Sequence, residues 1–272
     1  MRRFVLITGA GSGIGLASSL EAARLGFDVV AAVHHADQVE AVRAAASGAG
    51  VDVRPEVLDV TDEGRSAALV DEVRPWAVVN NAATPNAGAV EDVPVDTVRH
   101  QFDVMLLAPM RLVQLALPHM RRTGEGRIVN VSSIAHDTVS PMLGWYDAAK
   151  AAFSALSDAL RVELAHQGVD VVLVEPGIVR TPIWDEVAAD LRRRRDAAMT
   201  PEAYDAAIAA AERAAARGAD VEEVAQTVGA TLHAGHPRFR YRVGAGAHLL
   251  PAAAQLVPTS VRDRVVRGVA GL

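Results

Sequence analysis

The chain has 272 residues, half of them hydrophobic, so it is long enough to bury a substantial core in one large domain or two small ones. Its formal net charge of −6 argues against nucleic acid or an anionic membrane as a partner. The absence of cysteine excludes disulfides, thiolate metal sites and cysteine nucleophiles; it fits a cytoplasmic protein, and we expect no metal site.

The predicted elements alternate between strands and helices. The apolar run at 4–8 is too short for the core of a signal peptide and is followed by glycines, so it predicts a strand. Thr61 is predicted to cap the helix at 62–73, while Pro109 and Pro118 are predicted to kink a long helix. No stretch reaches the roughly 20 apolar residues that a membrane span needs. Further strands are predicted at 29–33, 51–58, 76–79, 127–131, 169–174 and 239–243, and helices at 14–25, 36–46, 62–73, 97–122 and 145–166.

Valine- and isoleucine-rich strands between helices indicate a parallel sheet covered on both faces, with right-handed crossovers. The predicted fold is therefore α/β, a single doubly wound Rossmann-type domain over 1–272, with a ligand crevice at the carboxyl ends of its strands. Residues 1–177 are assigned to the cofactor-binding and catalytic core. Residues 178–236 are assigned to a helical insertion that covers the substrate, and 237–272 to the last strand and a C-terminal extension.

A glycine-rich turn joins the first strand to the first helix, with the sequence Thr8-Gly9-Ala10-Gly11-Ser12-Gly13-Ile14-Gly15. Glycines let the backbone approach a pyrophosphate closely, and the amino end of a helix offers free N–H groups. The spacing is T-G-x-x-x-G-x-G and not the G-x-G-x-x-G of the usual dinucleotide fingerprint. The turn predicts a nucleotide site.

Tyr146 and Lys150 are four residues apart on a predicted helix and share one face. A phenol titrates near pH 10, and a neighbouring ammonium stabilises its deprotonated form, so the pair forms a tuned acid–base group. Lys150 is the only lysine among 27 lysines and arginines. An arginine there hardly shifts its pKa and fits differently, which favours a specific role for this ammonium.

These motifs together resemble the short-chain dehydrogenase/reductase family. The resemblance is carried by the glycine-rich turn and by motifs that follow in order along about two thirds of the chain: Asp59, Asn80-Asn81-Ala82-Ala83, Ser132-Ser133, Tyr146-x-x-x-Lys150, and Pro176-Gly177 with Thr181.

By that resemblance, the catalytic residues are Ser133, Tyr146 and Lys150, with Ser133 hydrogen-bonded to the substrate oxygen and Ser132 the weaker candidate. A serine-hydrolase role for Ser133 lacks the G-x-S-x-G elbow. The expected cofactor contacts are Gly9, Gly11, Ser12, Gly13, Ile14, Gly15, His34, Asp59, Val60, Asn81, Ala82, Tyr146, Lys150, Pro176, Gly177, Val179 and Thr181.

The chain departs from the family pattern at two positions. Met105 stands where an asparagine usually holds a water of the proton relay, and a thioether cannot donate a hydrogen bond. Ala83 stands where glycine is common, which we interpret as a small packing change.

The end of the second strand carries no acid at Val33 or His34. A carboxylate there would bind the ribose of NAD and repel the extra phosphate of NADP, so we expect NADP(H) to be favoured over NAD(H). His34 and His35 are candidates to meet that phosphate.

The expected function is an oxidoreductase that interconverts an alcohol and a carbonyl by hydride transfer. Apolar side chains around Ile183, Trp184 and Met142 predict an apolar small-molecule substrate, although ordinary core packing explains them equally well. The last third resembles, more loosely, the hydroxysteroid and retinol dehydrogenase-like branch. We expect a homo-oligomer, a dimer or tetramer. The alternative, favoured by Met105, is a catalytically silent nucleotide-binding or regulatory protein on the same scaffold.

Overall fold

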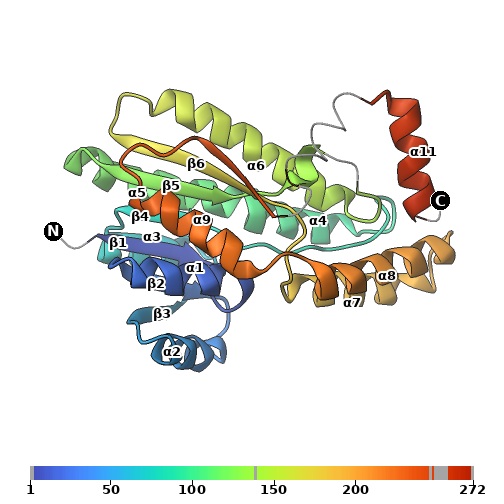
Figure 1. The fold of residues 1–272 in the computed structure, drawn as a ribbon, viewed down its shortest axis with the longest axis horizontal. Coiled ribbons are helices and arrows are strands. Elements are labelled where there is room, and N and C mark those ends of the chain that lie inside the picture. Colours follow the sequence, from blue (N-terminus) through green and yellow to red (C-terminus); the bar gives the residue numbers. More distant parts are fainter. Residues whose placement is uncertain (1–2, 138–139, 245–246, 248–256, 271–272) are drawn as a thin grey trace.

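The computed structural model describes residues 3–137, 140–244, 247 and 257–270. Within them, seven strands form one parallel sheet in the order β3-β2-β1-β4-β5-β6-β7 (Figure 1). The strands are β1 (Phe4–Thr8), β2 (Asp28–Val33), β3 (Val53–Val57), β4 (Ala77–Asn80), β5 (Gly126–Val131), β6 (Val169–Pro176) and β7 (Arg240–Val243). The doubly wound α/β fold predicted from the alternation is confirmed.

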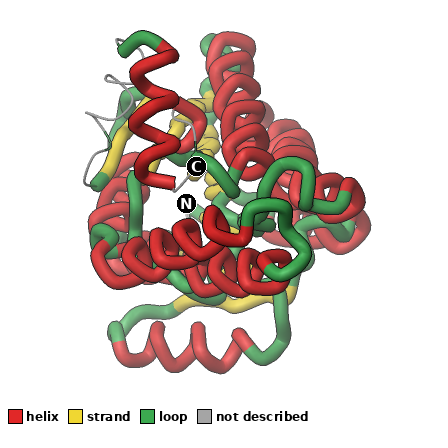
Figure 2. Tube along the Cα trace, turned by 90° about the vertical axis from the view of Figure 1, so that its right-hand side faces the viewer, coloured by secondary structure: helices red, strands yellow, loops and turns green. Residues whose placement is uncertain are grey.

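Helices cover both faces of this sheet (Figure 2). One face packs against α1 (Gly13–Arg24), α2 (Gln38–Gly48) and α9 (Val221–His233). The other packs against α3 (Glu63–Val73), α5 (Ala108–Thr123) and α6 (Gly144–Glu163). Consecutive residues of β1 alternate between the two layers, with Val5 and Ile7 in one and Leu6 in the other, as the two-residue period of a strand requires.

A smaller helical layer stands beyond the carboxyl ends of the strands. It contains α7 (Ile183–Arg195) and α8 (Pro201–Arg217), which pack on each other and on residues Ala87 and Met142. Helix α11 (Thr259–Ala270) lies beside α8 at the same end of the molecule (Figure 1). Helix α9, although inside the 178–236 segment, packs on the sheet through Val224, Val228 and Leu232. Within that segment, α7 and α8 are therefore the helices that stand away from the sheet.

The helix expected at 97–122 is divided. Helix α4 (Val95–Phe102) runs into a π-helical segment, η1 (Asp103–Leu107), which continues as α5. Pro109 has no N–H for the carbonyl four residues earlier, which belongs to Met105, and this missing bond accounts for the local change of helical pitch.

The predicted cap of α3 is wrong by one residue. Asp62 occupies the N-cap position, and its side chain accepts a hydrogen bond from the Arg65 N–H. The Thr61 hydroxyl instead donates to Asp59 Oδ1 at 2.7 Å. A carboxylate next to the helix start is a strong competitor for this position, because it accepts hydrogen bonds and complements the helix dipole.

Candidate active site

A large cavity opens at the carboxyl ends of the strands, where the strand order reverses between β1 and β4. Its volume of about 1130 Å³ exceeds the roughly 300–1000 Å³ of a site for one small ligand. The glycine-rich turn, Tyr146, Lys150 and helices α7, α8 and α11 all contribute to its wall. The space therefore suits a cofactor and a substrate together.

The glycine-rich turn presents an uncapped helix end to this cavity. Ser12 is the N-cap of α1, and its side chain makes no capping hydrogen bond. Gly13 adopts a φ of +53°, a conformation that side chains disfavour, and lines the cavity. The free N–H groups and the helix dipole form a cradle that fits a pyrophosphate.

Gly15 packs closely against the backbone of the glycine-rich turn. It does not line the cavity, and a Cβ there would stand 2.2 Å from the Gly9 carbonyl oxygen and 2.6 Å from Asn81 Nδ2. Gly15 thus has a packing role in this structure, and its contact with a cofactor stays a prediction. The other residues predicted for the cofactor and for catalysis all line the cavity.

Asn81 and Thr8 hold the turn in place. Asn81 Nδ2 donates to the carbonyls of Thr8 and Gly9 at 3.0 and 3.2 Å. The Thr8 hydroxyl accepts from the N–H groups of Asn81 and Ala82. These bonds link β1 to β4 beside the crevice, so the family-like Asn-Asn-Ala-Ala segment fixes the shape of the nucleotide loop.

Lys150 and Tyr146 meet on the cavity side of α6. Lys150 Nζ lies 5.8 Å from the centroid of the Tyr146 ring and donates to the Val131 carbonyl at 2.8 Å. Burial lowers the pKa of Lys150 to about 8. Burial raises the pKa of the Tyr146 phenol above its usual range and the charge of Asp147 raises it further, while a hydrogen bond with Ser133 opposes them. The phenol is therefore protonated near neutral pH.

The two serines after β5 have different surroundings. Ser133 lines the cavity, hydrogen-bonds Tyr146, and accepts from the Ala135 N–H at 3.1 Å. Ser132 is only 4% exposed; its hydroxyl contacts that of Ser154 at 2.8 Å and donates to the Lys150 carbonyl at 3.3 Å. The geometry places the Ser133 hydroxyl, and not that of Ser132, next to the phenol.

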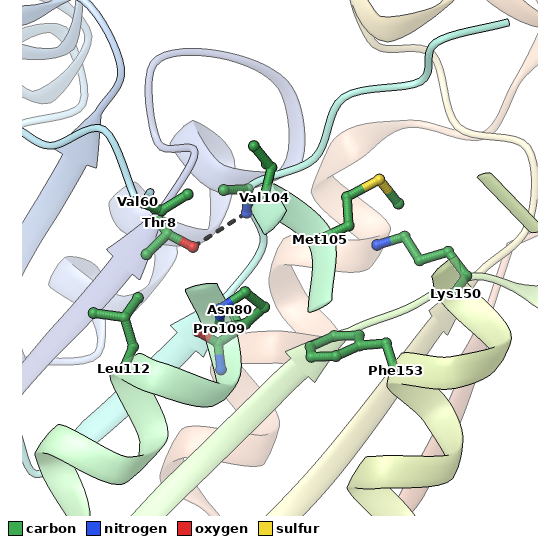
Figure 3. A pocket seen from close by; sticks show the side chains of 10 residues that line it. Thr8, Val60, Asn80, Val104, Met105, Pro109, Leu112, Lys150 and Phe153 are labelled. Carbon is green, nitrogen blue, oxygen red and sulfur yellow. Dashed lines mark hydrogen bonds between the residues drawn. The ribbon is translucent and has the colours of Figure 1, made fainter. Parts of the chain in front are cut away.

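Met105 lies beside Lys150. It is fully buried in η1, and its thioether and the Lys150 ammonium point toward one another (Figure 3). Both line a second cavity of about 10 Å³, close to the size that holds one water molecule. Asn80 lines it too; its Nδ2 donates to Asn130 Oδ1, and its Oδ1 is buried without a partner among the described residues.

The end of β2 presents His34 to the crevice. Val33 is fully buried in the core beneath the sheet, so its side chain cannot select a cofactor. His34 and His35 line the cavity with Gln38 and Asp59. Burial raises the pKa of Asp59, but hydrogen bonds from Thr61 and the charge of His34 lower it more, so the carboxylate is ionised. His34 Nε2 lies 3.8 Å from Asp59 Oδ2.

Hydrogen bonds join helices α7 and α8 to the loop that follows β4. The buried Tyr204 hydroxyl donates to Asp92 Oδ2 at 2.6 Å and accepts from the Ala89 N–H at 3.0 Å. Asp190 accepts from the Ala87 N–H at 3.0 Å. The covering helices therefore have a defined position over the cavity.

Several residues that line the cavity were not predicted from the sequence, because only the tertiary fold brings them to the site. They are Gln38, His100, Glu186, Leu191, Ala207, Ala210, Ala211, Ala214, Val257, Arg262, Val265 and Val266. The alanines of α8 recur with helical spacing, and this spacing was the available signal for a buried helix face.

Across the part of the chain that the structure describes, no helix is long and apolar enough to cross a membrane. In the same residues, no three histidine, aspartate or glutamate side chains gather as metal ligands.

Comparison with known proteins identifies the family. The model for short chain dehydrogenase matches residues 3–192. The uncharacterized oxidoreductase YusZ of Bacillus subtilis is 30% identical, with 98% of each chain covered. Human retinol dehydrogenase 5 is also 30% identical, over 98% of this chain and 88% of its own.

Solved structures agree. A Beutenbergia cavernae protein described as a putative NAD(P)-dependent gluconate 5-dehydrogenase, with bound NADP, is 31% identical at a TM-score of 0.69, covering 83% of this chain and 88% of its own. A Burkholderia phymatum short chain dehydrogenase/reductase in complex with NAD shares the fold at a TM-score of 0.80 and 24% identity, covering 97% and 95%. The chain belongs to the short-chain dehydrogenase/reductase family and is an NAD(P)-dependent oxidoreductase.

Proposed function

We propose that this short-chain dehydrogenase interconverts an apolar alcohol and its ketone or aldehyde, with Tyr146 as the acid–base group. The observation that carries the proposal is the contact of a buried ammonium, Lys150, with a phenol that also hydrogen-bonds Ser133 at the wall of the large cavity. This arrangement supplies both proton transfer and polarisation at one substrate oxygen.

Ser133, Tyr146 and Lys150 each have a different role in the proposed reaction. In the reductive direction, Ser133 donates a hydrogen bond to the carbonyl oxygen, and the Tyr146 phenol transfers its proton to that oxygen. Lys150 stabilises the phenolate that this transfer leaves. A nicotinamide cofactor held by the glycine-rich turn would supply the hydride, or would accept it in the oxidative direction. The raised pKa of Tyr146 keeps the proton available for reduction.

We propose NADP(H) as the preferred cofactor. Its support is the crevice end of β2, where His34 and His35 stand in place of a carboxylate. The relative from Beutenbergia cavernae binds NADP, which is compatible with this preference. The uncapped amino end of α1 would hold the pyrophosphate; Thr181 lies beside Gly13 of the glycine-rich turn, and Lys150 lines the same cavity.

The substrate side favours an apolar compound. Met142, Leu143, Ile183 and Trp184 line the same cavity as Tyr146, and the Trp184 indole donates to the Val179 carbonyl at 2.8 Å, which fixes its ring. Apolar walls with few polar groups select a substrate by shape and by the reacting oxygen.

We also propose a homo-oligomer, a dimer or tetramer. Leu156 and Val162 expose 40% and 62% of their surface on α6, which is apolar area available for a second copy. Light scattering on the purified protein would give the mass directly; a monomer at micromolar concentration would contradict this proposal.

The test of function is a cofactor-difference screen. Purified protein is mixed with NADPH or NADP⁺ and a panel of apolar ketones and alcohols, and nicotinamide absorbance is followed. We expect turnover that Tyr146→Phe abolishes while cofactor binding by titration stays close to normal. Cofactor binding without turnover of any compound would favour the alternative that Met105 suggests, a catalytically silent nucleotide-binding protein. Turnover by Tyr146→Phe within a few-fold of the parent would refute the acid–base assignment.

A further inference from the structure

The large cavity has two chemically different ends. The end at the glycine-rich turn offers N–H groups and polar side chains, and suits the cofactor. The other end lies between α7, α8 and α11 and is mostly apolar. Its wall includes Val187, Leu191, Ala207, Ala211, Ala214 and Val265.

Arg262 is a charged side chain at this apolar end. It projects from α11, the helix that stands beside α8 in Figure 1. Its Nε is buried and has no hydrogen-bond partner among the described residues. A buried donor without an acceptor is costly, so a ligand that supplies an acceptor would be favoured at this point.

Arginines of α7 are already paired. Arg192 meets Glu212 at 2.6 Å, and Arg195 meets Asp205 at 2.5 Å, in both cases on the exposed outer side. Arg262 differs in facing the cavity, and no ion pair is formed with it by the described residues. Its guanidinium is therefore available to a bound molecule.

We propose that Arg262 binds a carboxylate at the far end of an apolar-chained substrate. The proposal rests on the proposed function, since the other end of that chain carries the reacting oxygen at Tyr146. A guanidinium presents paired N–H donors that match the two oxygens of a carboxylate, and it remains charged in apolar surroundings. The substrate class is thus a long-chain hydroxy or oxo acid, with its two functional groups at opposite ends of the cavity.

Glu186 supports this orientation. It lines the same cavity from α7, and burial raises its pKa, with further contributions from Asp190 and Asp185. Asp190 is paired with Arg193 and Arg194, so Glu186 is the acidic group that a substrate carboxylate placed against α7 would approach, whereas one placed against α11 meets a cation. The charge distribution therefore directs the acid end toward Arg262.

The test compares two matched ketones. The first is an oxododecanoate whose ketone lies next to the terminal methyl group, and the second is its methyl ester. With NADPH-saturated enzyme, we expect kcat/KM to be higher for the acid by about ten-fold or more. Arg262→Gln should bring the two substrates close to equality. Arg264→Gln, which removes the same charge from an exposed position of α11, should keep the parental ratio.

Three kinetic results would overturn the proposal. They are equal kcat/KM for acid and ester in the parent, an undiminished preference in Arg262→Gln, and an equal loss in Arg262→Gln and Arg264→Gln. An equal loss in both variants would mean that the preference for the acid over the ester arises from the overall electrostatic field of α11 and not from Arg262 itself.

A binding measurement separates this inference from the proposed function. Calorimetry of the NADPH-saturated parent with dodecanoate and with dodecanol requires neither turnover nor a variant, because neither compound is a ketone or an aldehyde that NADPH could reduce. Tighter binding of the acid supports the carboxylate site even if neither ketone is reduced, in which case the proposed reaction alone fails. Binding of the acid that is no tighter than that of the alcohol refutes the site, including where Arg262→Gln does not fold.

Discussion

Lys150 donates to the main-chain carbonyl of Val131 at 2.8 Å while only 4% of the residue is exposed. The ammonium is thereby held against the end of β5, beside Tyr146. We expect Lys150→Arg to lose activity by about 100-fold or more, although it keeps the charge, because a planar guanidinium does not fit a site shaped for an ammonium. The measurement is kcat with saturating cofactor. Arg161→Lys on the exposed part of the same helix is the control, and parental activity in Lys150→Arg would contradict a specific role for the ammonium.

Met105→Asn tests the departure from the family pattern. An amide in η1 would place a hydrogen-bonding group next to Lys150 and the 10 Å³ cavity at Asn80. We expect turnover to rise, or its pH dependence to sharpen, with little change in cofactor affinity, because general acid–base assistance contributes factors of about 100 to 10,000.

A solvent isotope effect on the parent identifies the limiting step for that experiment. A substantial effect that Met105→Asn reduces would mean that proton delivery limits the parent. A negligible effect together with an unchanged rate in Met105→Asn would show that Met105 is a packing residue, and that a step such as product release limits turnover.

His34→Asp tests the choice of cofactor. An acid at this exposed crevice position would repel the 2′-phosphate of NADP and accept hydrogen bonds from the ribose of NAD. We expect the ratio of kcat/KM for the two cofactors to move toward NAD by about ten-fold or more. His236→Asp, at an exposed position, is the control for overall charge. A parent that binds NAD at least as tightly as NADP by titration would already contradict the proposed preference.

Asp147 predicts a pH dependence of stability. Burial raises its pKa to about 7 from the ordinary value of 3.8, while the Ser140 N–H donates to its Oδ2 at 3.0 Å. Between these two values the folded state binds more protons than the unfolded state. The contribution of the Asp147 carboxyl group to the stability of the fold is therefore complete below about pH 4 and is lost as the pH rises through 7.

The comparison is between denaturant unfolding of the parent and of Asp147→Asn over that range. The difference in unfolding free energy between them should change by up to about 4 kcal/mol, with the parent relatively less stable at pH 8. Asp52→Asn, at an exposed position, should follow the parent. Parallel curves for the parent and Asp147→Asn would contradict the shifted pKa.

Tyr204→Phe tests the attachment of the covering helices. The change leaves Asp92 and the Ala89 N–H without their partner, so the unfolding free energy should fall by about 1–3 kcal/mol. KM for apolar substrates should rise, because α8 forms part of the cavity wall. Tyr241→Phe removes a phenol whose hydrogen bond with the Arg238 N–H is exposed, and it serves as the control. Equal stability of the two variants would mean that Tyr204 contributes packing alone.

The strands of the sheet and the pair of Tyr146 and Lys150 could be predicted from the sequence because the patterns that indicate them span only a few residues. Apolar runs separated by helical spacing identify the strands, and the four-residue separation of Tyr146 and Lys150 requires only a helix. Arg262 lies more than a hundred residues from Tyr146 and reaches the cavity only through the packing of α11 beside α8, for which no short pattern exists. The burial of the Val33 side chain was also not predicted, because the position of a residue at a strand end does not reveal toward which face of the sheet its side chain points.

The strand order also determines how this chain reaches its native state. Every pair of neighbouring strands is parallel, so no ladder can begin with a tight turn, and each requires a crossover. The β6–β7 pair, with Leu173 opposite Arg240, encloses all of α7, α8 and α9. Closing such a loop costs chain entropy before any of its hydrogen bonds form. Refolding should therefore be slow for a domain of this size, with the substrate wall completed after the half that holds the nucleotide.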